Sequence, residues 1–205
     1  MADIASATVL DAGCAMGFLV EALRDQGVDA FGIDVSEYGL SQARADIRPF
    51  CRQASVTQPF PRRFDLIVCI EVLEHLPAAD APRAVQNIAR HSDDVLFSST
   101  PDDYREATHF NVQPPEFWAE LFAREDMYRD VDYDASYITP WATRFRRRRD
   151  PPARQVAQYE RLVRRLMAEN RALRELTLER RAEPAPAPAA PDGQDDLTGS
   201  RSAGP

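Results

Sequence analysis

The sequence contains no lysine, so all 25 of its basic residues are arginines. A P-loop needs a lysine to reach its phosphates, and that class of nucleotide site is therefore excluded. The three cysteines form no CxxC pair and are too few for a disulfide framework, which argues against structural zinc and predicts a reducing setting. No apolar run approaches the roughly 18 residues of a membrane helix, and residues 1–7 lack the features of a secretory signal. We therefore expect a cytoplasmic protein with no membrane span.

Charge is divided unevenly along the chain. Residues 1–143 carry 11 arginines and 24 acidic residues, whereas residues 144–181 carry 13 arginines and 5 acidic residues. The acidic part argues against an extended nucleic-acid surface, and the basic part keeps that question open locally. The last part of the chain is rich in alanine and proline, a composition that cannot bury a core. We therefore predict a globular domain over 1–149, a basic amphipathic helix over 150–182 and a disordered tail over 183–205.

Strand-like and helix-like stretches alternate through the predicted globular domain. The run "FDLIVCI" is nearly continuous in apolar residues, as expected for a central strand buried on both faces. The alternation predicts a doubly wound, mostly parallel α/β sheet. The last two strands have no helix between them, which predicts an antiparallel hairpin at one edge. Strands are expected at 8–10, 30–35, 50–54, 64–70, 95–99, 128–135 and 141–146, and helices at 18–26, 37–45, 80–90, 115–123 and 155–181.

The first strand, turn and helix form the most informative stretch, "VLDAGCAMG" at residues 9–17. A glycine-containing turn between a strand and a helix presents backbone N–H groups and the positive helix end to a ligand. Ala15 stands where a dinucleotide-binding turn has its second glycine, so the spacing does not favour a diphosphate. Asp11 at the mouth repels phosphate and suits an amino group. The alternative is a tight strand–helix connection in which Asp11 only caps the turn and Asp34 only caps the next helix.

Four segments, "VLDAGCAMG", "FGIDVS", "FDLIVCIEVLEHLP" and "VLFSSTPDD", occur in that order. Together they resemble class I S-adenosylmethionine (SAM)-dependent methyltransferases of the small-molecule type over residues 8–147. The resemblance implies a Rossmann-like methyltransferase fold with SAM as the co-substrate. It also implies methyl transfer to a small-molecule or glycan acceptor, on an oxygen, with a sugar hydroxyl as the first choice. No metal is expected, because the adjacent acids Asp102 and Asp103 are typical of a solvated loop.

The resemblance assigns roles to residues of the expected cofactor site. Asp11 would bind the SAM ammonium, and Gly13 and Gly17 would lie under the methionine portion. Asp34 would accept hydrogen bonds from both ribose hydroxyls. Ser55 stands where the family often has Asp or Asn for the adenine amino group. A helix would follow the fourth strand in the third segment. Ile70 and Glu71 would face the methionine side, unless Glu71 only starts that helix. The full expected set is Asp11, Gly13, Cys14, Gly17, Asp34, Val35, Ser55, Val56, Ile70 and Glu71.

Methyl transfer from a sulfonium needs alignment of donor and acceptor and, for a hydroxyl acceptor, removal of a proton. His109 lies in "PDDYREATHFNVQPPEFW", the long connection after the fifth strand, which borders the ligand crevice of such a sheet. We predict that His109 is the general base or orients the acceptor, with pinning of the loop as the alternative. His75 is the second candidate, with donation to a backbone carbonyl as its alternative. His91, at the end of an expected helix, is expected to face water.

The run "RFRRRR" at 144–149 raises the possibility of nucleic-acid binding. No aromatic residues interleave these arginines as stacking platforms, so RNA binding is not favoured, and some of the arginines are expected on an edge strand. In the helix that follows, Tyr159, Leu166 and Leu173 recur every seven residues. The repeat spans about two and a half heptads, which predicts either a plain solvated helix or a coiled coil that joins copies of the chain into a homo-oligomer, with an acidic glycan or a membrane surface as the other partner considered. The contact residues expected for the coiled coil are Leu162, Leu166, Leu173 and Leu176.

Two rival functions belong to other classes. Only seven residues precede the first expected strand, where relatives carry helices that cover SAM. This difference motivates the first rival, a catalytically silent SAM-binding partner module. The second rival is an RNA methyltransferase that uses the arginine-rich segment, although the chain lacks the Asn-Pro-Pro-Tyr or Asp-Pro-Pro-Tyr type motif that methylation of base nitrogens often uses.

Overall fold

A computed structural model of the protein describes residue 4 and residues 6–148 and 150–182. The tail predicted to be disordered, 183–205, lies outside the described residues. The chain divides into two units, Met1–Tyr159 and Glu160–Pro205. The first unit holds the sheet with the helices packed on it, and the boundary falls inside the last helix, α5 (Pro152–Ala182).

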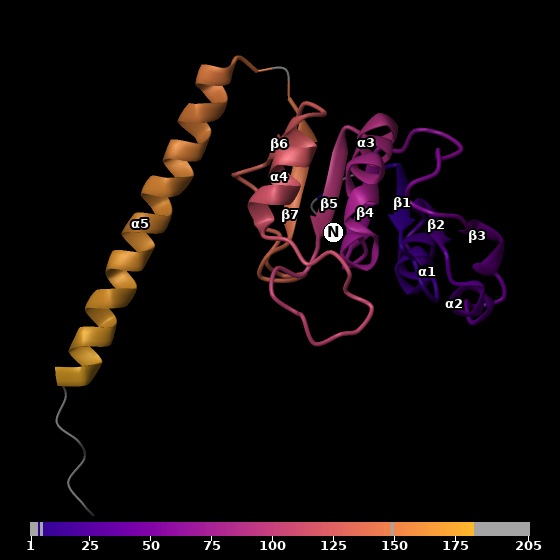
Figure 1. The fold of residues 1–205 in the computed structure, drawn as a ribbon, viewed down its shortest axis with the longest axis horizontal. Coiled ribbons are helices and arrows are strands. Elements are labelled where there is room, and N and C mark those ends of the chain that lie inside the picture. Colours follow the sequence, from indigo (N-terminus) through magenta and orange to yellow (C-terminus); the bar gives the residue numbers. More distant parts are fainter. Residues whose placement is uncertain (1–3, 5, 149, 183–205) are drawn as a thin grey trace, which may run out of the picture. The chain divides into compact units, whose positions relative to one another are not determined.

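The first unit is built on a seven-stranded sheet, shown in Figure 1. The strands are β1 (Thr8–Ala12), β2 (Asp29–Asp34), β3 (Cys51–Gln53), β4 (Leu66–Ile70), β5 (Asp94–Ser98), β6 (Met127–Arg129) and β7 (Thr143–Arg147). Their order is β3-β2-β1-β4-β5-β7-β6, with parallel pairing from β3 through to β5. β7 pairs antiparallel with β5 and with β6. The prediction of a mostly parallel, doubly wound sheet with an antiparallel edge hairpin is therefore confirmed.

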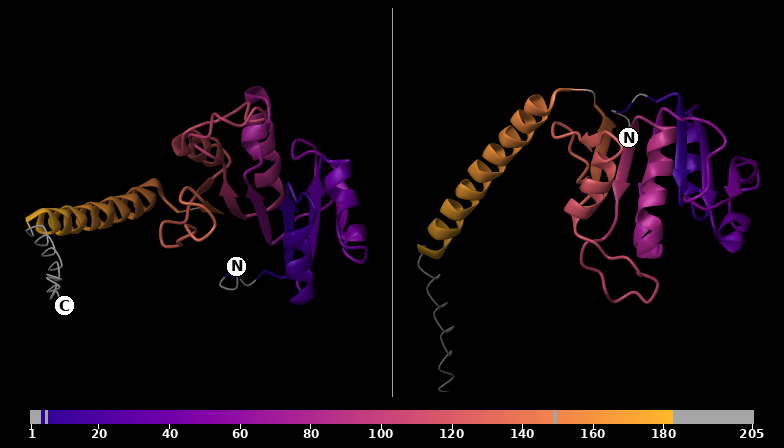
Figure 2. Two further views of the ribbon diagram at one scale, coloured as in Figure 1. Left: turned by 90° about the horizontal axis from the view of Figure 1, so that it is seen from below. Right: turned by 45° about the horizontal axis from the view of Figure 1, so that its top comes forward.

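Helices cover both faces of this sheet. They are α1 (Phe18–Asp25), α2 (Glu37–Ser41), α3 (Ala81–His91) and α4 (Pro115–Ala123), with the 3-10 turns η1 (Arg48–Phe50), η2 (Leu73–His75) and η3 (Ala78–Asp80). Figure 2 shows α3 and α4 on one face and α1 on the other, in agreement with the two cores to which their side chains belong. Among the described residues, no helix is both long enough and apolar enough to cross a membrane.

Strand β4 passes between two hydrophobic cores, because its side chains alternate between the faces of the sheet. Ile67 and Cys69 join the core that contains α3 and α4, whereas Leu66 and Val68 join the core that contains α1. Phe122 of α4 is fully buried in the first of these cores. Full burial of a side chain of this kind contributes roughly 1.5–3 kcal/mol. Burial on both faces explains why the sequence of β4 is continuously apolar.

Two helical segments are shorter than the sequence predicts. The helix expected at 37–45 ends at Ser41, and Gly39 inside it lowers its helix propensity. The helix expected after β4 is only the 3-10 turn η2. Glu71, between β4 and η2, has a left-handed φ of 53°, a conformation that a helix cannot continue from.

Strand β6 is also shorter than predicted. The strand expected at 128–135 is observed only over Met127–Arg129. The chain turns at Asp130, whose carbonyl oxygen accepts a hydrogen bond from Tyr133 N–H at 3.2 Å. This turn keeps the buried Asp130 carboxylate beside the arginine side chains of the hairpin, where Arg148 lies 3.1 Å away.

The arginine run of β7 pairs with acids inside the fold. β7 lies between β5 and β6, so the expectation that these arginines sit on an edge strand is wrong. Arg144 donates to Asp94 at 2.8 Å, and the two side chains are only 12% and 15% exposed. Arg147 donates to Asp93 at 2.7 Å. These ion pairs occupy the guanidinium groups that a nucleic-acid site would need free.

We expect Arg144→Leu to lower the free energy of unfolding by about 3–5 kcal/mol, because the change leaves Asp94 buried without its main partner. Arg146→Leu on the same strand is the control. The Arg146 side chain is 47% exposed and its Nε lies 3.8 Å from Asp94, so the expected loss is below about 1 kcal/mol. Urea denaturation measures both variants, and equal losses would contradict a buried Arg144–Asp94 pair.

Candidate cofactor and active site

A cavity of about 410 Å³ opens at the carboxyl ends of β1, β2 and β4. In doubly wound sheets, ligands bind in the crevice outside these strand ends. Its wall is formed by the glycine turn after β1, the end of β2, the segment after β3, and η2 with the residues beside it. The expected site residues that line it are Gly13, Asp34, Val35, Ser55, Val56, Glu71 and His75.

Four of the expected cofactor-binding residues are absent from the wall of this cavity. Asp11 lies beneath the turn and is 8% exposed. Cys14 turns its thiol toward Cys51 and belongs to the core that contains α1. Gly17 is the N-cap of α1, and Ile70 packs half-buried against the same core. These four residues therefore lie behind the wall.

Main-chain hydrogen bonds hold the glycine turn to β2. Gly13 N and Cys14 N both donate to Ile33 O, at 2.8 and 2.9 Å. Gly13 has a φ of 98°, and a Cβ at this position would collide with the Val72 side chain, so only glycine fits. Ala15 has a φ of 45°, a conformation that costs a non-glycine residue of order 1–3 kcal/mol and is typical of ligand sites.

Asp34 ends β2 and binds the glycine turn through its carboxylate. Its Oδ2 accepts a hydrogen bond from Ala15 N at 2.8 Å, and its Oδ1 accepts one from Ser36 N at 2.8 Å. The N-cap of α2 is Ser36, whose hydroxyl accepts from Gly39 N at 3.0 Å. Asp34 is therefore not the N-cap of α2, and its contact with a ligand stays a prediction. Each Asp34 oxygen keeps a lone pair that can accept a ligand hydroxyl.

Asp11 is a buried acid at the foot of the same turn. Burial foremost, and the charge of Asp34 second, raise the pKa of Asp11 from 3.8 to about 7. No cation or hydrogen-bond donor in the described part of the chain offsets these two effects. A positively charged group brought in by a ligand would favour the ionised form and lower the pKa again. The position therefore suits an ammonium group.

Glu71 links three parts of the chain at the edge of the cavity. It is not the start of a helix, since its φ is 53°. Its Oε1 accepts hydrogen bonds from the Ser98 hydroxyl at 2.6 Å and from Trp141 Nε1 at 2.9 Å. The carboxylate thus joins the end of β4 to the end of β5 and to the segment that precedes β7.

His75 and His109 lie side by side, with ring centroids 4.7 Å apart. His75 Nδ1 donates to Thr108 O at 3.2 Å, and His109 Nδ1 donates to Asp103 O at 2.8 Å, with the tautomers assigned from these partners. Both rings therefore pin the loop 99–114, as the alternatives for each residue predict. The contacts leave Nε2 of each ring as the basic atom. The hydrogen bond to Asp103 O and the negative charge of Glu106 raise the pKa of His109.

Glu74 is a candidate functional residue that the sequence analysis missed. It is fully buried, and burial above all raises its pKa to about 7. Its Oε1 accepts a hydrogen bond from Thr100 N at 3.3 Å, whereas Oε2 has no partner among the described residues. The sequence feature that could have identified Glu74 is its place as the second acid of "EVLEH". Glu71, just before the 3-10 turn, lies close enough for its charge to raise the pKa of Glu74 further.

Two groups of side chains near the cavity have the spacing of metal ligands. Glu74, His75 and His109 bring one ligand atom each within 4.8 Å of one another, and so do Asp103, Glu106 and His109. Metal-ligating histidines commonly donate their other ring N–H to a backbone carbonyl, as both rings do here. These are the described residues that could hold an ion, at a place where the sequence analysis expected none.

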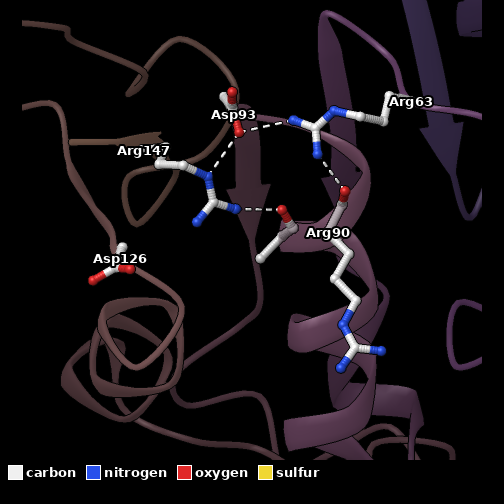
Figure 3. A pocket seen from close by; sticks show the side chains of 6 residues that line it. Arg63, Arg90, Asp93, Asp126 and Arg147 are labelled. Carbon is white, nitrogen blue, oxygen red and sulfur yellow. Dashed lines mark hydrogen bonds and ion pairs between the residues drawn. The ribbon is translucent and has the colours of Figure 1, made fainter. Parts of the chain in front are cut away.

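A second cavity, of about 560 Å³, lies near the amino end of β5, as Figure 3 shows. Asp93 accepts hydrogen bonds from Arg63 at 2.8 Å and from Arg147 at 2.7 Å. The same two guanidinium groups donate to the carbonyl oxygens of Arg90 and Ala89, in the last turn of α3. These cations stabilise the end of a helix, so we assign no ligand to this cavity.

The family model described as "Methyltransferase domain" matches residues 2–146. The ubiquinone biosynthesis O-methyltransferase of Pseudomonas paraeruginosa is 33% identical over 133 residues, which cover 60% of this chain and 56% of that protein. The protein of the same name from Coxiella burnetii is 36% identical over 143 residues, which cover 65% of this chain and 60% of that protein. The chain thus spans little more than half the length of these curated relatives.

Solved structures show the same fold at low identity. The magnesium protoporphyrin IX methyltransferase of Synechocystis PCC 6803, with bound SAH, has a TM-score of 0.57 at 17% identity, over 68% of this chain and 74% of that one. A sugar N-methyltransferase from Streptoalloteichus has a TM-score of 0.56 at 16% identity, over 70% and 81%. The sheet order and the turn at its centre are those of a Rossmann-like methyltransferase. The chain belongs to the class I SAM-dependent methyltransferase family.

We expect Asp11→Asn to stabilise the protein at neutral pH. Because the folded pKa of Asp11 is raised from 3.8 to about 7, the folded state holds a proton that the unfolded state releases, and stability falls as pH rises between these values. The loss reaches up to about 4 kcal/mol, at 1.36 kcal/mol for each pKa unit. Urea denaturation at pH 4.5 and 7.5 measures it. The variant should escape the loss, whereas Asp102→Asn in the exposed loop should behave like the unmodified protein.

Proposed function

We propose that the protein is a SAM-dependent methyltransferase that transfers the methyl group to an oxygen of a small molecule. The observation that carries the proposal is the pair of acids at one glycine turn: Asp34 lines the cavity, and Asp11 lies buried beneath the turn, behind the cavity wall. Asp11 pairs with the SAM ammonium, and Asp34 accepts hydrogen bonds from the ribose hydroxyls. Gly13 lets the methionine portion approach the backbone, because it has no side chain.

The adenine ring is assigned to the apolar part of the cavity, between Val35 and Val56. The Ser55 hydroxyl accepts from Thr57 N at 3.2 Å and shares a hydrogen bond with the Thr57 hydroxyl at 2.8 Å. When Ser55 donates its hydroxyl proton to Thr57, one lone pair of Ser55 remains for the adenine amino group. In this proposal Cys14, Gly17 and Ile70 act from behind the wall, by fixing the path of the turn and of β4.

The reaction is an in-line displacement. The bond from the methyl carbon to the sulfonium sulfur breaks as the bond to the acceptor oxygen forms, and sulfur leaves as a neutral thioether. Alignment of the two reactants supplies up to roughly 7–11 kcal/mol in well-oriented systems. The proton of the acceptor hydroxyl goes to Nε2 of His109, because Nδ1 is bound to Asp103 O. The Glu106 carboxylate lies 3.6 Å from this Nε2 and would stabilise the protonated ring. His75, packed against this ring, holds it in place.

The acceptor is a small molecule that carries a hydroxyl group. Tyr104 and Phe110 of loop 99–114 are 74% and 68% exposed, and they offer apolar surface to an acceptor ring. The relatives named as ubiquinone biosynthesis O-methyltransferases support oxygen as the acceptor atom. A sugar hydroxyl is the other acceptor class that fits the proposal. RNA is disfavoured, since the described arginines of β7 are paired with acids.

We also propose that the protein works in a reducing, cytoplasmic setting, as the sequence predicts. Cys14, Cys51 and Cys69 are all free thiols. Free thiols of this kind persist in the cytoplasm, where disulfides are rare.

Titration of SAM by calorimetry tests the pocket. We expect Asp11→Asn and Asp34→Asn each to weaken binding about 10–100-fold, because each removes charge-assisted hydrogen bonds worth about 1.5–3 kcal/mol. Asp102→Asn is the control and should bind normally. Affinity should rise up to tenfold per pH unit until Asp11 is ionised near pH 7, and fall above about pH 8 as the α-amino group of SAM loses its proton. Absence of SAM binding by the unmodified protein would refute the proposal.

Replacement of His109 tests the proposed base. His109→Ala should lower kcat about 10²–10⁴-fold while SAM affinity stays unchanged, because a positioned base contributes that much. In the unmodified protein the acid limb of kcat/KM should lie above pH 6.5, since the pKa of His109 is raised, and the limb should disappear in the variant. His91→Ala, which changes a histidine on α3 outside the cavity, is the control. Full turnover by His109→Ala would show that the ring only pins the loop.

Transfer of a labelled methyl group from SAM to a panel of acceptors separates the remaining functions. Label on a phenolic or sugar hydroxyl supports the proposal and names the acceptor class. Label on RNA would instead support the rival that uses the arginine-rich segment. SAM binding without transfer to any acceptor class would favour the catalytically silent partner module.

A further inference from the structure

Helix α5 carries a row of exposed apolar side chains. Leu166 and Leu173 are 52% and 63% exposed, and Val163 is 41% exposed. A helix in water gains most of its stability from packing an apolar face against a partner. A helix of 31 residues with such a face therefore needs a partner along that face.

Two lines of contact residues compete for this partner, and in both the spacing alternates between three and four residues, as in a coiled coil. The Glu169 seam contains the leucines that the sequence analysis selected, and consists of Tyr159, Leu162, Leu166, Glu169, Leu173 and Leu176. The Asn170 seam is rotated slightly around the helix, and consists of Val156, Tyr159, Val163, Leu166, Asn170 and Leu173.

The polar residue inside each seam decides between the two. Two copies joined along the Glu169 seam would bury two carboxylates that face each other, at a cost of several kcal/mol per ion. Two copies joined along the Asn170 seam bury two amides that can hydrogen-bond to each other. A groove on α5 is lined by Val163, Leu166 and Asn170 of the second seam, together with Met167, Arg171 and Arg174 beside it.

We infer that α5 forms a parallel, two-stranded coiled coil with a second copy of this chain along the Asn170 seam. Val156, Val163 and Asn170 then occupy the a positions of successive heptads, and Leu166 and Leu173 occupy d positions. β-Branched residues at a with leucine at d favour two strands, and a single asparagine at a fixes register and oligomeric state. The seam revises the contact set expected from sequence, since it places Val163 inside the interface and the side chain of Leu176 at its flank.

Charge complementarity at the flanks supports the parallel orientation. Glu169 occupies a g position, and Arg174 occupies the e position of the next heptad, five residues later. In a parallel coil, Glu169 of one copy meets Arg174 of the second copy, and the two-fold symmetry repeats the pair. Leu162 and Met167 occupy the preceding g and e positions, where they extend the apolar contact.

Light scattering on the full chain over a dilution series tests the interface. We expect a mass of twice 23.1 kDa for the unmodified protein at high concentration, and a monomer for Val163→Asp. Leu176→Asp is the matched control, with the same substitution on the same helix, and should stay dimeric because this residue lies beside the seam. A monomeric unmodified protein, a trimer, or loss of the dimer by Leu176→Asp but not by Val163→Asp would overturn the inference.

Orientation is tested by cross-linking and by charge exchange. Asn170→Cys should form a disulfide between copies under mild oxidation, because a parallel coil places the two a positions side by side, and peptide mapping distinguishes it from bonds of the native cysteines. Glu169→Arg should weaken the dimer about tenfold, and the double variant Glu169→Arg/Arg174→Glu should restore it. Failure of both the cross-link at 170 and the restoration would overturn the parallel arrangement. SAM affinity should be unchanged throughout, so this test is independent of the proposed enzymatic function.

Discussion

The hydrogen bonds between the end of β2 and the glycine turn are the constraint on which the candidate site depends. Ile33 O accepts from two successive N–H groups of the turn, and the Asp34 carboxylate accepts from Ala15 N. Because β1 and β2 are neighbouring parallel strands, these bonds lock two strand ends into one rigid edge. They hold Ala15 in its left-handed conformation, and they keep Asp11 close enough to Asp34 for the two charges to interact.

Two buried acids of the candidate site have no cationic partner among the described residues. The pKa values of Asp11 and Glu74 both rise to about 7, in each case mainly through burial. A buried carboxyl of this kind lowers stability at neutral pH, and binding of a cationic group to the folded state recovers it. Such a trade of stability against ligand affinity is common at functional sites. The same reasoning applies to both acids, although Asp11 lies in β1 and Glu74 lies in η2, after β4.

The local features of this fold could be predicted from sequence, and the long-range contacts could not. Short sequence patterns are enough to predict three features: the apolar run of β4, the glycine turn and the acid at the end of β2. The anchoring of Glu71 by Trp141 joins residues 70 positions apart, and no local pattern reports it. The same holds for β7, which the arginine run suggested as an edge strand but which lies between β5 and β6. Glu74 was missed because its burial arises only when loop 99–114 covers it.

The arginines at one end of the sheet help to build the site at the other. Arg144 lies opposite Leu96 in the β5–β7 ladder, and its ion pair with Asp94 fixes that register. Trp141 comes just before β7, so the register of this strand determines whether the indole N–H reaches Glu71. Guanidinium groups suit this task, because their planar donor arrangement holds a carboxylate in a defined orientation, whereas an ammonium group acts as a point charge. A chain that uses arginine alone for positive charge therefore gains directional ion pairs. The arginine run of β7, although its composition is typical of nucleic-acid binding, is thus part of the scaffold.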